Sequence, residues 1–140
     1  MRTRLRGYDL GIFLVMATLL AGCGGDSGHG NGPQTFSPVG VWDGTMLTPP
    51  PQNGLRSLTL TLQEAGTDIT GTAQISDATG TPYWDGSVTG SQSKAGLFLT
   101  ATSVGAGSFN LDGQFKDSDA ITATLNGGGW INTPVTLTRR

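Results

Sequence analysis

The sequence has very little of the two residue types that build most nucleophilic and metal sites. Cys23 is the only cysteine and His29 the only histidine among 140 residues, and both lie in the first part of the chain. One cysteine cannot form a disulfide within the chain, and residues 39–140 cannot assemble a His- or Cys-based metal site or a catalytic triad. We therefore expect no catalytic residues, no metal and no cofactor, and we predict that the protein is not an enzyme.

Charge is also scarce. Only 13% of the residues are charged, with 8 Lys and Arg against 10 Asp and Glu, and the net charge is −2. Proteins that bind nucleic acid need a basic patch to neutralise phosphates, and no such cluster occurs here. The composition predicts that the protein has no nucleic-acid partner.

The first residues have the parts of a secretory signal. Arg2, Arg4 and Arg6 form a positive segment, and Leu10 to Leu20 is apolar apart from Gly11 and Thr18. This apolar stretch of about 11 residues is in the range of signal peptides and is shorter than the ~20 residues of a spanning helix. It favours a cleaved signal over an uncleaved transmembrane anchor.

Leu20-Ala21-Gly22-Cys23 follows this stretch and resembles the lipobox of bacterial lipoproteins. The resemblance implies that residues 1–22 are a cleaved signal peptide and that Cys23 carries a diacylglyceryl group, which makes a membrane the partner of the mature N-terminus. Two or more acyl chains give stable attachment. Because glycine rather than aspartate follows Cys23, the resemblance implies the outer membrane, facing the periplasm.

Residues 23–38 are almost all glycine, polar residues and proline. Such a segment has too little apolar surface to bury, so we expect a flexible tether after the lipidated Cys23. The folded domain is expected to span residues 39–140 and to be held just off the membrane.

Residues 39–140 show short alternating runs rich in Thr, Val, Leu and Ile, separated by Gly, Pro, Asn and Asp. No stretch has helical periodicity, so the fold class is all-β. Short, even connections favour an antiparallel eight-stranded up-and-down barrel, although a two-sheet β-sandwich stays open as an alternative. The predicted strands are Val39–Thr48, Arg56–Glu64, Ile69–Ser76, Tyr83–Gly90, Leu97–Ser103, Ser108–Phe115, Ala120–Asn126 and Thr133–Arg139.

Alternation assigns one face of each strand to the interior. Leu58, Leu60 and Leu62 share a face, with Thr59 and Thr61 on the other. The same parity points threonines of the later strands to solvent. Acidic residues that follow a bulky residue, such as those of the repeated Trp-Asp-Gly motif, are expected to face outward and not to converge on one site.

Gly40-Val41-Trp42 and Arg139 resemble a signature of lipocalins, in which a Gly-x-Trp of the first strand lies under an arginine of the last strand. Val135 and Leu137 put Arg139 on the inward face by parity alone. The resemblance implies a short lipocalin-like, calycin-type barrel whose end is plugged by Gly40, Trp42 and Arg139. A cation–π contact there would contribute about 1–2 kcal/mol, whereas Arg139 extending into solvent would contribute nothing.

Three functions remain open for such a domain. An eight-stranded barrel holds side chains or one small molecule, so a small apolar or amphipathic ligand is the first. The residues predicted to contact it are Trp42, Leu60, Tyr83 and Trp84. The alternatives are a protein-interaction or protease-inhibitor-type module that binds an envelope protein, and a structural envelope lipoprotein without a discrete ligand.

Overall fold

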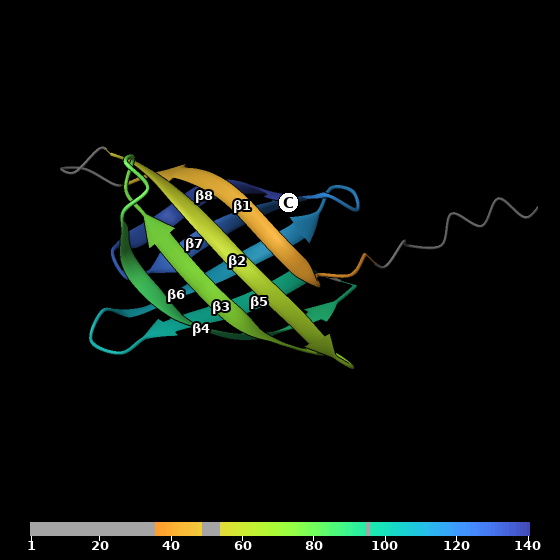
Figure 1. Ribbon diagram of the computed structural model, residues 1–140. Helices are drawn as coiled ribbons and strands as arrows, with labels where there is room; N and C mark the ends of the chain where they lie inside the picture. Colours follow the sequence, from red (N-terminus) through yellow and green to blue (C-terminus); the bar gives the residue numbers. More distant parts are fainter. Residues whose placement is uncertain (1–35, 49–53, 95) are drawn as a thin grey trace, which may run out of the picture. The chain divides into compact units, whose positions relative to one another are not determined.

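A computed structural model describes residues 36–48, 54–94 and 96–140. Within them the fold is all-β, and Figure 1 shows the strands as a tilted meander. Every strand pairs antiparallel with its neighbours in the sequence, and the first pairs with the last, so the sheet is a closed eight-stranded barrel. The strands are β1 (Gly40–Leu47), β2 (Leu55–Ala65), β3 (Asp68–Ser76), β4 (Pro82–Ser93), β5 (Gly96–Ser103), β6 (Gly107–Phe115), β7 (Ala120–Gly127) and β8 (Trp130–Arg139).

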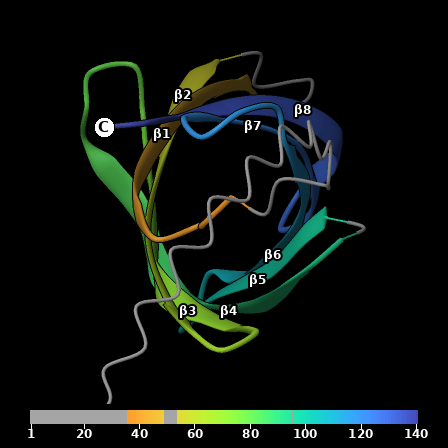
Figure 2. The ribbon, with the colours of Figure 1, turned by 90° about the vertical axis from the view of Figure 1, so that its right-hand side faces the viewer.

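The barrel closes because each strand has one apolar and one polar face. Leu58, Leu60 and Leu62 of β2 are buried, whereas Thr70 and Thr72 of β3 are exposed on the outer face. Figure 2 shows the strands as a ring. The buried apolar side chains form one core cluster inside it. Closure leaves no unpaired edge, which decides between the barrel and the two-sheet sandwich. The largest fully buried side chains are Trp42, Leu58, Leu60, Leu62, Ile69, Ile75, Leu97, Leu111, Ile121, Leu125, Leu137 and Val88.

Glycine permits the tight curvature of this small barrel. A Cβ atom added at Gly71 of β3 would lie 2.0 Å from the carbonyl oxygen of Thr61 on β2. A Cβ added at Gly86 of β4 would lie 2.4 Å from the carbonyl oxygen of Thr102 on β5. These backbones therefore approach more closely than any side chain allows, as expected where strands bend sharply.

Most strands differ from the predicted ranges by one residue at an end, but β4 and β8 are longer by three residues or more. β8 begins at Trp130 rather than Thr133, because Gly127, Gly128 and Gly129 all have positive φ and turn the chain within a few residues. Trp130 can then pair directly with Gly127. β4 runs on to Ser93 because its pairing with β5 continues to the turn.

The meander gives the barrel two ends, which lie at opposite sides of Figure 1. We call the end that carries residues 36–39 the strap end. It also carries the β2–β3, β4–β5 and β6–β7 turns and the C-terminus. The far end carries the β1–β2, β3–β4, β5–β6 and β7–β8 connections. The described residues contain no helix that is long and apolar enough to cross a membrane.

Candidate functional site: the two ends of the barrel

Arg139 lies across the strap end. Its Cζ atom is 4.4 Å from the centroid of the Trp42 ring, the distance of a cation–π contact. The Nη2 atom donates a 2.7 Å hydrogen bond to the carbonyl oxygen of Ser37, and Nη1 donates to that of Val39. The Nε atom donates a 3.1 Å hydrogen bond to the carbonyl oxygen of Ser118 and lies 3.5 Å from Oδ1 of Asp119. One guanidinium thus joins the last strand, the first strand and the segment that precedes it.

Local sequence explains why Arg139 can occupy this position. Trp42 pairs in register with Arg139 on one side and with Leu60 on the other, so the ring lies inside the barrel mouth. Gly40 has a φ of +138°, and a Cβ atom there would approach Nη1 of Arg139 to 3.1 Å. Gly40 therefore supplies both an unusual backbone conformation and the space for the guanidinium.

Residues 36–39 form a strap over the same end. The Trp42 indole donates a 2.7 Å hydrogen bond from Nε1 to the carbonyl oxygen of Pro38. Gln92 donates from Nε2 to the carbonyl oxygen of Phe36 at 2.6 Å. The ring centroids of Phe36 and Phe115 are 5.8 Å apart, and those of Phe115 and Trp42 are 5.9 Å apart. These contacts cover the lumen at the strap end.

Trp42 and Leu60, two of the residues predicted to contact a ligand, lie in the half of the barrel next to the strap. Trp42 is 0% exposed and Leu60 is 1% exposed. Both pack within the continuous apolar interior, and a ligand that entered from the strap end would have to displace the strap. Trp42, Leu60 and Trp84 belong to one continuous buried core, whereas Tyr83 is exposed.

Trp84 and Tyr83 lie at the far end. Trp84 points inward and is 8% exposed, and its ring centroid lies 4.9 Å from that of Phe109 on β6. Met46 and Trp130 are also buried near the ends of their strands on this side. Aromatic side chains therefore line the interior of the far end.

Tyr83 is exposed, unlike the buried Trp84 that follows it. Ile75 pairs with Trp84 and Ser76 with Pro82, so the register shift leaves Tyr83 as the extra residue of a bulge. Its side chain is 53% exposed, and the Arg56 guanidinium lies 5.3 Å from the ring centroid. Arg56 was not among the residues predicted from the sequence, although it shares the inward parity of Leu58.

Exposed apolar side chains concentrate around the same end. Val104 and Ile131 belong to the β5–β6 and β7–β8 hairpins, and Leu47 and Leu55 flank the β1–β2 connection. Together with Tyr83, these residues form what we call the far-end rim. Five of the seven exposed large apolar side chains of the described residues therefore lie at the far end.

Hydrogen bonds to Asp77 order the β3–β4 turn beside this rim. Its Oδ1 atom accepts from Thr79 Oγ1 at 2.6 Å, from Thr81 N at 3.0 Å and from Thr79 N at 2.9 Å. The Thr79 hydroxyl and these two amides favour the charged carboxylate and lower the pKa of Asp77 below its ordinary value of 3.8. This turn is thus held in one conformation by its own acidic residue.

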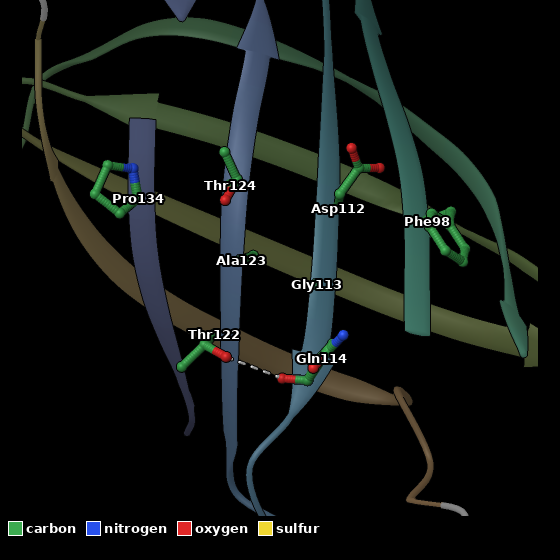
Figure 3. Close-up of a pocket in the computed structure, with 8 residues that line it drawn as sticks. All are labelled: Phe98, Asp112, Gly113, Gln114, Thr122, Ala123, Thr124 and Pro134. Atoms are coloured by element: carbon green, nitrogen blue, oxygen red, sulfur yellow. Dashed lines mark hydrogen bonds between the residues drawn. The ribbon is translucent and has the colours of Figure 1, made fainter. Parts of the chain in front are cut away.

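The outer face carries a separate, polar depression of about 420 Å³. Figure 3 shows Pro134, Thr124, Asp112 and Phe98 following one another across β8, β7, β6 and β5, with Thr122 donating to the Gln114 carbonyl below them. Asp85 also faces outward, on a strand that does not neighbour β6. No group of three or more His, Cys, Asp or Glu that could hold a metal occurs in residues 36–48, 54–94 and 96–140.

Solved structures with the same architecture include designed proteins. A de novo designed fluorescence-activating β-barrel matches with a TM-score of 0.58 and 14% identity over 73% of this chain and 93% of its own. A redesigned barrel, mFAP1, bound to DFHBI, matches with a TM-score of 0.57 and 15% identity over 72% of this chain and 94% of its own. A further redesigned barrel, b11L5F_LGL, matches with a TM-score of 0.55 and 16% identity over 73% of this chain and 90% of its own. No family model and no curated protein matches the chain.

Proposed function

We propose that this protein is a non-enzymatic, lipid-anchored envelope protein whose lipocalin-like barrel binds a small apolar or amphipathic ligand at its far end. The observation that carries the proposal is the Trp84–Phe109 pair, buried beneath the exposed far-end rim. Residues 36–39 and Arg139 lie over the strap end, which supports an entrance at the far end.

The ligand site of this proposal differs from the one that the sequence pattern predicts. Tyr83 and Trp84 remain in it, and three residues buried on the same side join them. Trp42 and Leu60 become the packed floor that fixes the barrel. Burial of apolar ligand surface contributes about 25 cal/mol per Å², so an aromatic lining of this kind supports binding without a charged partner. The three added residues are Phe109, Trp130 and Met46.

The designed barrel mFAP1 supports the proposal that a barrel of this size can hold a small molecule. Its structure is of a redesigned β-barrel bound to the small molecule DFHBI, and it has the same fold as this chain at 15% identity. An eight-stranded barrel therefore can accommodate one small molecule. The identity is too low to carry the ligand itself over, so the proposal concerns a class of ligand and not DFHBI.

Native mass spectrometry of the full chain, purified from membranes in detergent, tests the proposal. We expect an additional mass from a co-purifying small molecule, and we expect Trp84→Ala to lose it. A protein that carries no additional mass, and that neither quenches nor shifts its tryptophan fluorescence with small apolar molecules, would contradict ligand binding.

Anchoring through Cys23 and an outer-membrane location, facing the periplasm, complete the proposal. They rest on the resemblance of residues 20–23 to a lipobox, and Cys23 lies outside the described residues. The described chain starts at Phe36 on the strap end, which is the end of the barrel opposite the far-end rim.

A second candidate function is favoured by the rim alone. Val104 and Ile131 are largely exposed on hairpins, as expected for a surface that an envelope protein covers. Under this alternative the protein is an interaction or protease-inhibitor-type module. Val104→Asp together with Ile131→Asp would abolish capture of that partner and leave small-molecule binding unchanged.

A further inference from the structure

Arg56 is an inward-facing cation at the far end. It precedes the inward Leu58 by two residues on β2, and its backbone pairs with that of Met46, which is buried. Leu58 in turn pairs with Ile75, and Ile75 pairs with Trp84. The guanidinium therefore belongs to the same end of the interior as the proposed aromatic lining.

The hydrogen-bonding capacity of Arg56 is only partly used. Nη1 donates to the carbonyl oxygen of Leu55 at 3.0 Å, but Nε is buried and has no partner. The ion pairs in the described part of the chain are made by Arg139 and Arg140. Hydrogen bonds from Thr79 and Thr81, and then the nearby charge of Arg56, lower the pKa of Asp77. Asp77 Oδ1 accepts from its own turn, and Asp77 forms no ion pair with Arg56. Nη2 makes no hydrogen bond within the described residues, so the guanidinium keeps donors for an acceptor from outside the chain.

The bulge in β4 holds this guanidinium in place. Tyr83 is the residue left without a cross-strand partner, and its ring centroid lies 5.3 Å from Arg56 Cζ. A bulge beside a site re-aims a side chain, and here it brings an aromatic face to a cation. The contact orients the planar guanidinium against the Tyr83 ring at the far end.

We propose that Arg56 binds the anionic head group of an amphiphilic ligand whose apolar body lies against Trp84 and Phe109. The chemical class is an organic anion, such as a carboxylate, attached to an apolar chain or ring. The head group accepts hydrogen bonds from Nη2 of the guanidinium, which gives the ligand one orientation with its charge at the rim. This inference rests on the proposed far-end ligand site and adds the identity of its polar contact.

Titration of the full-chain protein with three molecules of equal chain length tests it. Decanoate, 1-decanol and decylammonium, each below its micelle concentration, are compared by tryptophan fluorescence and calorimetry. One charge-assisted hydrogen bond predicts that decanoate binds about tenfold more tightly than 1-decanol, and that decylammonium binds more weakly than either. Arg56→Gln is expected to remove the preference for decanoate and to leave the Kd of 1-decanol unchanged.

Lys94→Gln is the matched control, because it removes one positive charge at the strap end and should retain the tenfold preference. Equal binding of decanoate and 1-decanol by the unaltered protein would overturn the role of Arg56 and leave the apolar site standing. Absence of binding by all three molecules would overturn both proposals. Since the unaltered protein alone gives these outcomes, the test does not depend on the folding of the Arg56 variant.

Discussion

Arg139→Gln is expected to lower the free energy of unfolding by about 3 kcal/mol. The cation–π contact with Trp42 contributes about 1 kcal/mol at a site that is partly desolvated. The two hydrogen bonds to the carbonyls of Ser37 and Val39 contribute about 1 kcal/mol each in net terms. The ion pair with Asp119 adds little because that carboxylate is 72% exposed. Glutamine can replace at most one of these contacts.

Urea unfolding followed by tryptophan fluorescence and circular dichroism measures this loss. For a domain of about 100 residues, 3 kcal/mol corresponds to a fall in Tm of roughly 12–20 °C. Arg140→Gln is the control, because its ion pair with Asp43 is at the surface and is expected to contribute at most about 1 kcal/mol. A loss below about 1 kcal/mol for Arg139→Gln, or equal losses for both variants, would refute the role given to Arg139.

Three further predictions concern other parts of the chain. Gly71→Ala places a Cβ 2.0 Å from the Thr61 carbonyl oxygen, so a loss of about 3 kcal/mol or more in urea unfolding is expected, and normal stability would contradict the curvature argument. The pKa of Asp77 is lower in the folded than in the unfolded chain, so its stabilising effect is present above about pH 4 and is lost as the pH falls below 3.8. Asp77→Asn should therefore weaken the pH dependence of the free energy of unfolding at acidic pH. An unchanged pH dependence would contradict the role given to Asp77. Cys23→Ser is expected to move the protein from the membrane to the soluble fraction, and retention in the membrane would contradict the anchor.

Alternation accounts for most of what could be predicted of the fold. Leu58, Leu60 and Leu62 define the interior of β2 because a strand has a period of two, and the same period puts Arg139 on the inner face of β8. The number of strands and their order follow from short turns rich in glycine and polar residues. Closure of β1 on β8 confirms the barrel, which the pattern alone did not separate from a sandwich.

The candidate site was harder to predict because it depends on irregular pairing. The bulge at Tyr83 arises from the register of β4 with Ser76, which no local sequence signal encodes. Trp130 was missed as a strand residue because three consecutive glycines with positive φ shorten the turn before it. The parity of Arg56 with Leu58 indicates that its side chain faces inward. Parity alone does not mark a site residue, because an inward arginine is also typical of a strand end.

Two tryptophans with the same local sequence motif lie at opposite ends of the barrel. Trp42 and Trp84 both open Trp-Asp-Gly motifs, yet Trp42 lies under Arg139 and the strap, whereas Trp84 lies beneath the far-end rim. The difference follows from their places on strands that run in opposite directions: Trp42 is near the start of β1 and Trp84 is near the start of β4. Adjacent strands of a meander alternate in direction, so equal positions in odd and even strands lie at opposite ends.

The most direct test of a barrel sealed at one end and binding at the other uses the three tryptophan indoles, Trp42, Trp84 and Trp130. Each gives one Nε1–H signal in a ¹⁵N–¹H correlation spectrum of the full chain. On addition of decanoate or 1-decanol, we predict that the signals of Trp84 and Trp130 shift and that the signal of Trp42 stays in place. A shift of the Trp42 signal with those of Trp84 and Trp130 unmoved would contradict the account.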